Sequence, residues 1–225
     1  MNIPIWTPGK PSHYGERHFR FSPKLGRRVA TSSKLEYERS LLLEYDPDVE
    51  SFCEQPVEAV AEINGRICRS RLDFGVINRA GGFRYEEVKY RADLAKPDAR
   101  ANRQLAIQRA WCLENGYEHR LVTDSEIWRI PTLINSLRTL LQEFTEQTYG
   151  LLQAASKHSA HVLLQVCRWP GMPLIELLNG CPTASPRGLY RLAVLDLIRT
   201  RKLDALLETQ RFCPRSKVYP AGGAK

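Results

Sequence analysis

The dipeptide Asn64-Gly65 constrains the fold of this chain more than any other feature of its sequence. It joins the run VEAVAEI (57–63) to the run ICRSRLDFGVI (67–77), which alternates between apolar and polar residues as a strand does. Asn-Gly is the favoured dipeptide of the two-residue turn that connects antiparallel strands. The sequence therefore predicts a β-hairpin here, with 67–77 as one continuous strand.

Further helices and strands are predicted on both sides of this hairpin. The run SKLEYERSLLLEY (33–45) contains strong helix formers and stops before Pro47, which disfavours helical geometry in the residue before it. FRYEEVKY (83–90) is rich in the aromatic and β-branched residues that strands prefer. A helix after Pro97 and a last strand, YEHRLVTD (117–124), complete the order helix, three strands, helix, strand.

We expect three parts along the chain. The order of elements predicts an α/β domain on a mixed sheet over about residues 31–130. Leucines then recur at helical spacing, which predicts a mostly helical domain over 131–225. Within it, PLIELLNG, the turn CPTASP and a helix from Arg187 have the proportions of a helix-turn-helix, and RFCPRSKVYP those of a small wing. Residues 1–30 mix prolines with aromatic and basic residues, so we expect a basic aromatic arm that packs on the domain surface or follows a DNA backbone.

The basic residues are concentrated at the two ends of the chain. The 225 residues carry a formal net charge of +8, which divides into +5 over 1–30, −3 over 31–130 and +6 over 131–225. Basic flanks attract polyanions by neutralising phosphates, which favours a nucleic-acid partner. The alternative is a basic protein whose charge serves only solubility.

Composition excludes several other classes of protein. None of the six cysteines falls in a C-x-x-C pair, so neither a zinc ribbon nor a disulfide framework is indicated. No stretch approaches the roughly 20 apolar residues that cross a bilayer, and the N-terminus lacks the order of a signal peptide. We therefore expect a cytoplasmic protein with no membrane partner.

Asp73, Glu87 and Lys89 form the pattern D-x(13)-E-x-K across two predicted strands. Since side chains alternate on a strand, Glu87 and Lys89 share a face opposite Val88, and Asp73 lies opposite its apolar neighbours. Two carboxylates on adjacent strands are hard oxygen ligands suited to Mg²⁺, and a lysine beside them can orient the attacking water in phosphodiester hydrolysis. The alternative is a solvated sheet face with a cross-strand ion pair.

Glu36 is a fourth candidate, on the helix that precedes the sheet. Ser33-Lys34-Leu35-Glu36 fits the S-x-x-E capping box, in which the glutamate accepts a hydrogen bond from the backbone N–H of the cap residue. Spacing alone therefore favours a capping role. Glu38 and Glu44 on the same helix are alternative candidates for any catalytic role that a glutamate of this helix has.

These residues resemble a known family. The stretch SSKLEYERSLLLEYDPDVESFCEQP, followed by RLDFGV, EEVKY and GYEHRLVTD, is similar to the N-terminal catalytic domain of TnsA, the endonuclease subunit of heteromeric cut-and-paste transposons, including CRISPR-associated ones. The resemblance covers about residues 31–130 and implies a restriction-endonuclease-like core of the PD-(D/E)xK type. It places Glu36 with the family's helix glutamate. One departure is Leu72, which stands where this nuclease class often has a proline.

The resemblance also implies an activity, a cofactor and partners. It implies Mg²⁺-dependent cleavage at the 5′ ends of a transposon, with Mn²⁺ as a substitute metal, alongside a TnsB-like transposase and a TnsC-like AAA+ ATPase. The rival interpretations are a stand-alone repair or restriction nuclease of the same fold and a non-catalytic DNA-binding scaffold. We expect metal ligation by Asp73, Glu87 and Glu36, and catalytic assistance by Lys89. The basic residues expected to contact double-stranded DNA are Arg17, Arg20, Arg27, Arg28, Arg187 and Arg191.

Overall fold

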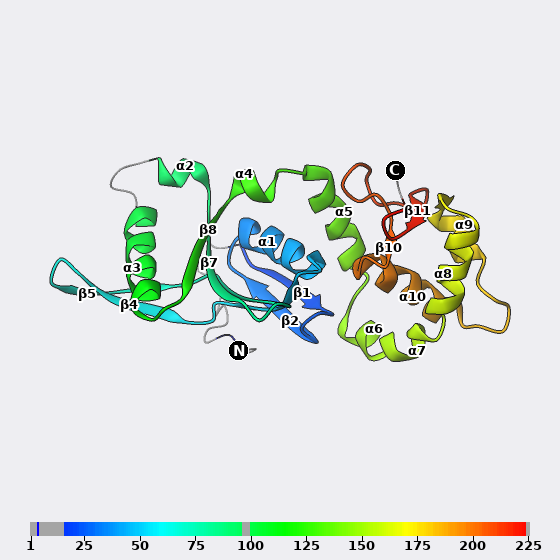
Figure 1. Ribbon diagram of the computed structural model, residues 1–225, viewed down its shortest axis with the longest axis horizontal. Helices are drawn as coiled ribbons and strands as arrows, with labels where there is room; N and C mark the ends of the chain where they lie inside the picture. Colours follow the sequence, from blue (N-terminus) through cyan, green and yellow to red (C-terminus); the bar gives the residue numbers. More distant parts are fainter. Residues whose placement is uncertain (1–3, 5–15, 96–99, 224–225) are drawn as a thin grey trace. The chain divides into compact units, whose positions relative to one another are not determined.

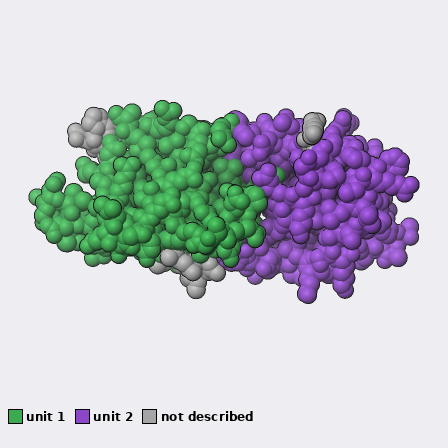
Figure 2. Space-filling model, in the orientation of Figure 1, with its two compact units in different colours: residues 1–20, 28–129 green, residues 21–27, 130–225 purple. Residues whose placement is uncertain are grey.

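The computed structural model of the chain (Figure 1) describes residue 4 and residues 16–95 and 100–223. The chain divides into two compact units, coloured separately in Figure 2. Unit 1 comprises residues 1–20 and 28–129, and unit 2 comprises residues 21–27 and 130–225.

Unit 1 is built on a four-stranded mixed sheet, as the sequence predicts. Its strands, in spatial order, are β3 (Val49–Glu54), β6 (Phe74–Asn78), β7 (Phe83–Lys89) and β8 (Glu118–Thr123). The first two pairings are antiparallel and the pairing of β7 with β8 is parallel. A parallel pair requires a long crossover connection, which here contains α2 (Arg91–Leu94) and α3 (Arg100–Glu114).

The Asn64-Gly65 hairpin forms as predicted. It joins β4 (Glu58–Ile63) to β5 (Arg66–Arg71), and both turn residues have positive φ, 49° for Asn64 and 74° for Gly65. Figure 1 shows α3 beside this hairpin. The two pack through a core of buried residues: Ala59, Ala61, Leu72, Tyr85, Ile107 and Cys112.

The prediction of one continuous strand over 67–77 is wrong. The strand breaks at Leu72 and Asp73, and β6 belongs to the main sheet while β5 pairs only with β4. The reason lies in the facing chain, which bends between β3 and β4 at Gln55, with a φ of 44°. The Leu72 N–H donates to the Val57 carbonyl, and the Gln55 N–H donates to the Asp73 carbonyl. The chain therefore stops pairing with β4 and begins to pair with β3 at Leu72 and Asp73, directly before β6.

Helix α1 (Lys34–Tyr45) begins and ends where the sequence predicts. Ser33 is its N-cap, and Asp46, directly before Pro47, is its C-cap. The Arg39 guanidinium donates two hydrogen bonds of 2.8 Å to the Glu86 carboxylate on β7. Both side chains are buried, so this ion pair fixes α1 against the sheet.

The region expected to be a basic aromatic arm contains a hairpin that was not predicted. Its strands are β1 (His18–Ser22) and β2 (Arg27–Thr31). Pro23 lies in the turn between them, where its missing N–H disturbs no pairing. The part of the arm over residues 1–3 and 5–15 lies outside the described residues.

Unit 2 is mostly helical, and a small sheet completes it. Along the chain its elements are α5 (Pro131–Leu141), α6 (Glu146–Gly150), α7 (Leu152–Ser156), α8 (Ser159–Arg168), β9 (Met172–Pro173), α9 (Leu174–Asn179), α10 (Arg187–Arg199), β10 (Leu203–Asp204) and β11 (Lys217–Pro220). The short strands pair in the order β10-β11-β9. Helix α10 forms the centre of the unit, because it contacts α5, α7, α8 and α9 and buries seven of its 13 residues.

Within the described ranges, no helix is both long and apolar enough to span a membrane. The helices of unit 2 are short, and each is amphipathic or partly polar, as expected of helices that pack around a core.

Candidate active site

The pairing of β6 with β7 brings Asp73 opposite Glu87. Phe74 pairs with Glu86 and Gly75 with Tyr85, so the same antiparallel register, continued by one residue, sets Asp73 beside Glu87. The Val88 N–H donates a hydrogen bond of 2.8 Å to Oδ2 of Asp73, which fixes this carboxylate at the end of the strand pair. Residues directly opposite each other in an antiparallel pair point to the same face, so both carboxylates share one face of the sheet.

Lys89 and Gln108 hold the two oxygens of the Glu87 carboxylate. The Lys89 ammonium forms an ion pair with Oε1 of Glu87. The amide nitrogen of Gln108, on α3, donates to Oε2 at 2.7 Å. Glu87 is 2% exposed, so it is a buried charge that these two donors compensate.

Gln108 is a residue of this site that was not predicted from the sequence. Its amide nitrogen also lies 3.0 Å from the Ser70 hydroxyl and 2.8 Å from the Arg71 carbonyl, and its amide oxygen lies 3.3 Å from Nε2 of His119. Gln108 is fully buried. The signal that could have found it is a polar residue on the apolar stripe of a helix, since buried amides are hydrogen-bonded.

Glu36 lies at the start of α1, and both of its oxygens have protein partners. Oε1 accepts from the Ser33 hydroxyl at 2.8 Å, and Oε2 accepts from the Ser32 N–H at 3.0 Å. The Ser33 hydroxyl in turn accepts from the Glu36 N–H at 3.1 Å. The capping role is thus present, but the glutamate binds the N–H of Ser32 and not that of Ser33 as the capping box predicts.

The charges of these side chains influence one another. Burial raises the pKa of Asp73 well above its usual value, and the nearby carboxylates of Glu87 and Glu36 raise it further. Burial also raises the pKa of Glu36, against the hydrogen bonds from Ser32 and Ser33. For Lys89, burial acts to lower the pKa, but the carboxylates of Glu87, Asp73 and Glu36 together outweigh it and the net shift is upward. The structure therefore gathers three carboxylates around one lysine.

The remaining acids near the site have other partners. The Trp128 indole N–H donates to Oε2 of Glu38 at 2.6 Å, and Glu44 forms an ion pair with Arg20 at 3.3 Å. Glu86, the neighbour of Glu87, is bound by Arg39 and Arg84, and the guanidinium charge of Arg39 contributes most to lowering its pKa against burial. Of the three candidate acids on α1, Glu36 is the one whose charge raises the pKa of Asp73.

The chemistry of these donors fits a hard divalent cation. Carboxylate oxygens are the ligands that Mg²⁺ prefers. Burial raises the pKa of Asp73 most, and the carboxylates of Glu87 and Glu36 raise it further, so a cation bound here would relieve their mutual repulsion. As the side chains stand, however, the described residues include no group of three or more His, Cys, Asp or Glu that could hold a metal ion. Glu87 and Glu36 have both oxygens engaged by protein donors, so a metal ion would use the remaining lone pairs of these oxygens or displace a donor.

The arginines predicted to contact DNA have different environments. The Arg20 side chain is largely buried, and its guanidinium donates to the hydroxyl and the carbonyl of Ser40 and to Glu44. This environment differs from the surface contact with DNA that was predicted for Arg20. Arg191 pairs with Glu143 at 2.9 Å. Arg28 and Arg187 are exposed, and Arg17 and Arg27 are half-buried.

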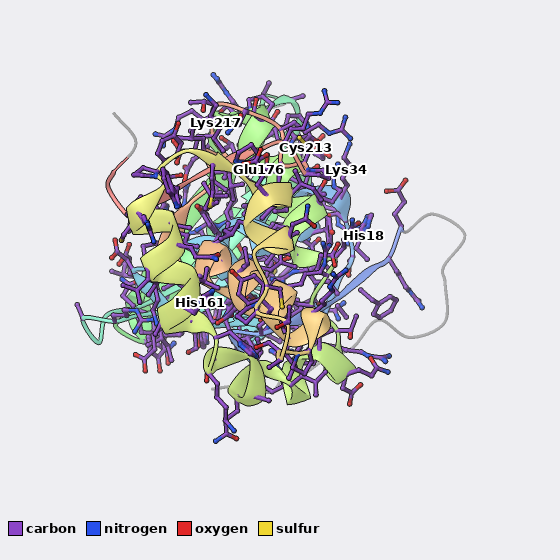
Figure 3. All side chains as sticks on the ribbon, turned by 90° about the vertical axis from the view of Figure 1, so that its right-hand side faces the viewer. His18, Lys34, His161, Glu176, Cys213 and Lys217 are labelled. Atoms are coloured by element: carbon purple, nitrogen blue, oxygen red, sulfur yellow. The ribbon has the colours of Figure 1, made fainter. Side chains whose placement is uncertain are left out.

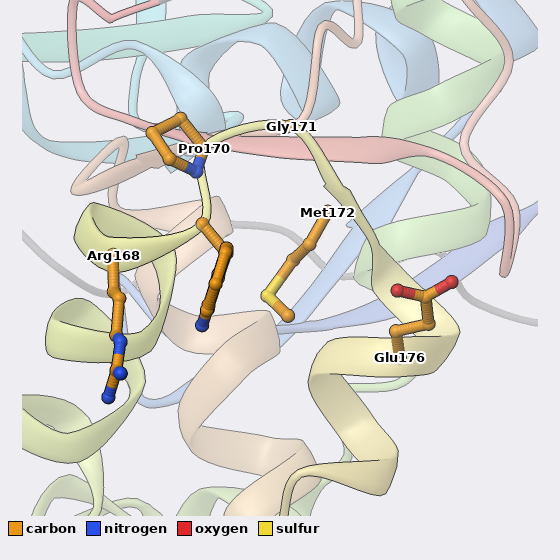
Figure 4. Close-up of a pocket in the computed structure, with 6 residues that line it drawn as sticks. Arg168, Pro170, Gly171, Met172 and Glu176 are labelled. Carbon is orange, nitrogen blue, oxygen red and sulfur yellow. The ribbon is translucent and has the colours of Figure 1, made fainter.

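Two hollows lie elsewhere in the units. One, in unit 1, has a volume of about 630 Å³ and is lined by Asp46, Asp48, Asn78, Arg79, Ala80, Arg84 and Arg120. The other, in unit 2, has a volume of about 510 Å³ and is lined by Arg168, Trp169, Pro170, Gly171, Met172 and Glu176 (Figure 4). Neither includes Glu36, Asp73, Glu87 or Lys89, so neither belongs to the candidate active site.

Comparison with known proteins identifies the class of the central segment. Residues 46–124 match the family model described as TnsA-like endonuclease N terminal. No curated protein matches the chain. This segment is therefore similar to the N-terminal domain of TnsA-like endonucleases, as the resemblance predicted for the central part of the chain. The match includes Asp73, Glu87 and Lys89, and it begins after Glu36 and ends before unit 2.

Proposed function

We propose that this protein is a divalent-metal-dependent endonuclease that cleaves double-stranded DNA at the 5′ ends of a transposon. The observation that supports this most directly is the register of β6 and β7, which aligns Asp73 with Glu87 beside Lys89. The TnsA-like segment contains all three residues. The proposed core is of the PD-(D/E)xK type, with Glu36 as its helix glutamate.

In this proposal Asp73 and Glu87 are the metal ligands, and Glu36 contributes directly or through a water molecule. The bound Mg²⁺ would supply a Lewis acid and lower the pKa of a water nucleophile. Lys89 already lies against Glu87, and its raised pKa keeps it protonated at neutral pH. Its ammonium is therefore suited to orient that water and to offset charge that develops on the scissile phosphate. Gln108 holds Glu87 in place from the side of α3.

We further propose that unit 2 contains a winged helix that serves DNA and partner binding. The order α8, β9, α9, α10, β10, β11, with β11 between the other two strands, has the helix-turn-helix followed by a strand pair that this architecture requires. The proposed partners are a TnsB-like transposase and a TnsC-like ATPase.

The test is cleavage of a duplex that carries the transposon ends, with the purified chain, its transposase partner and Mg²⁺. We expect nicks at the 5′ ends, and we expect Asp73→Asn and Glu87→Gln each to reduce the rate at least 100-fold. Removing a group that stabilises the transition state directly has effects of this size. If Asp73→Asn cuts as fast as the wild type, the proposed active site is wrong.

A matched control uses a glutamate on a different strand of unit 1. Glu58→Gln, on β4, changes an exposed carboxylate that pairs with Arg69 at 3.0 Å. We expect this variant to retain the wild-type cleavage rate, because that carboxylate takes no part in the candidate active site.

A further inference from the structure

The segment that joins α10 to the end of unit 2 carries exposed cations on a fixed backbone. We call residues 201–220, which include β10 and β11, the wing. It contains Arg201, Lys202, Arg211, Arg215 and Lys217 against two acids, Asp204 and Glu208. Lys202, Arg211, Arg215 and Lys217 are all exposed, and among the described residues none of these four forms an ion pair.

The backbone of the wing is held by two buried serines. The hydroxyl of Ser136, on α5, accepts from the Phe212 N–H at 3.0 Å and donates to the Gln210 carbonyl at 3.1 Å. The hydroxyl of Ser216 accepts from the Cys213 N–H at 2.9 Å. Both serines are almost completely buried, at 0% and 1% exposure. This loop is therefore held to the core of unit 2.

An alternating pattern directs the cations outward. Phe212, Ser216 and Val218 are buried, whereas Arg211, Arg215 and Lys217, each next to one of them in sequence, are exposed. Figure 3 labels Lys217 and the exposed Cys213, which lies between the two arginines in sequence. The buried positions fix the backbone of this stretch. Binding of a ligand would therefore restrict only the side chains of the exposed cations, and the entropy cost of ordering a loop would be avoided.

Helix α10, the expected recognition helix of a helix-turn-helix, offers much less surface. After Arg191 it has no exposed residue until its end, and two of its three cations have partners within the unit. Arg191 pairs with Glu143, and Arg199 pairs with Asp196 at 2.6 Å. A recognition helix contacts base edges mainly with its N-terminal residues. Of the two cations at that end of α10, Arg191 is already paired, and only Arg187 has no ion pair among the described residues.

We propose that the wing, and not α10, is the surface with which unit 2 binds the phosphate backbone of duplex DNA. Lys202, Arg211, Arg215 and Lys217, which form no ion pair among the described residues, match a polyanion. The fixed loop suits contacts that position the protein without reading sequence. The inference deepens the proposed function by naming the DNA surface. It concerns binding alone, so it can fail while the nuclease assignment stands, and the reverse also holds.

Binding is measured by fluorescence anisotropy of the full chain with a 30-base-pair duplex of arbitrary sequence, in EDTA, over a range of salt concentrations. We expect the triple variant Arg211→Gln, Arg215→Gln, Lys217→Gln to bind at least tenfold more weakly at about 0.1 M salt. The slope of log K against log salt should fall by roughly 3, since each phosphate contact contributes about 0.9. The three positions are exposed, so melting of the variant should match the wild type.

The matched control is the double variant Arg187→Gln, Arg191→Gln at the start of α10, which should keep the wild-type slope. The proposal is overturned if the wing variant binds as the wild type does, or if the α10 variant alone loses binding.

Two exposed cysteines of unit 2 provide a second test that needs no substitution. Cys213 lies in the wing and Cys167 on α8. Saturating duplex should slow thiol labelling of Cys213 several-fold and leave Cys167 unchanged. Equal rates with and without DNA would overturn the proposal. So would protection of Cys213 by a polyglutamate peptide but not by DNA, because the wing would then serve an acidic protein.

Discussion

At the scale of single residues, Gln108 is the side chain whose role follows most directly from the contacts at the site. It donates to Glu87 from a fully buried position, so it fixes the orientation of a proposed metal ligand. We predict that Gln108→Met weakens Mn²⁺ binding, measured by calorimetry, by about 10-fold to 100-fold, the usual cost of losing a partner of a metal ligand. The free energy of unfolding should also fall, by about 1–3 kcal/mol, because buried acceptors lose their donor.

A double-mutant cycle separates positioning from simple loss of packing. In a Glu87→Gln background, Gln108→Met should cause little further loss of Mn²⁺ affinity, since its effect passes through Glu87. A full additional loss in that background would show that Gln108 acts on the metal site by another route.

The sequence predicted the acids of this site better than their partners. Asp73 is far enough from Glu87 and Lys89 in sequence that the three form one cluster only if two strands pair. Those strands were recognisable from the alternation of apolar and polar residues. Spacing alone did not decide which of Glu36, Glu38 and Glu44 acts on Asp73, and only the family resemblance favoured Glu36. The reason is that Trp128 and Arg20, which engage the other two, are distant in sequence. Gln108 was equally hidden, since its partners lie on β5 and β7.

At the scale of elements, the Arg39–Glu86 pair is what fixes α1 against β7. Both side chains are buried, and Arg84 also donates to Glu86, at 2.8 Å. We predict that Glu86→Gln lowers the free energy of unfolding, measured by urea denaturation, by about 3–5 kcal/mol, because it leaves two buried guanidiniums without their counter-charge. Glu58→Gln, which breaks the exposed pair with Arg69, should cost less than about 1 kcal/mol. Equal losses in the two variants would contradict this account.

The elements themselves were predictable where a local signal exists. The Ser33 cap, Pro47 and the Asn64-Gly65 turn each act within a few residues, and α1 and the β4–β5 hairpin formed as expected. Strand β3 and the break at Leu72 and Asp73 were missed, because both depend on which strand the chain faces. The bend at Gln55 sets that choice, and its effect on Asp73 crosses nearly 20 residues of sequence.

At the scale of the whole molecule, the candidate active site should reduce the stability of the fold at neutral pH. A carboxyl group whose pKa is higher in the folded state than in the unfolded state binds protons more tightly when folded. For Asp73, stability is therefore lost as the pH rises from its ordinary pKa of 3.8 toward the raised folded value.

Asp73→Asn keeps an oxygen for the Val88 N–H but carries no charge. Without metal, we predict that it raises the melting temperature at pH 7, because the folded state no longer buries that charge. The gain should disappear near pH 3.5, as circular dichroism melts at both pH values would show.

Bound metal should reverse the order of the melting temperatures of the wild type and Asp73→Asn. A ligand that binds only the folded state stabilises it, by an amount set by the ligand concentration relative to the dissociation constant. At Mg²⁺ 100-fold above that constant, the wild type should gain about 2.7 kcal/mol, and Asp73→Asn should gain little because its charge is missing. The melting temperature of the wild type should therefore rise above that of the variant in Mg²⁺ and fall below it in EDTA. If Mg²⁺ shifts both proteins equally, the cation binds elsewhere on the chain, and the excess of negative charge at Asp73, Glu87 and Glu36 has another purpose.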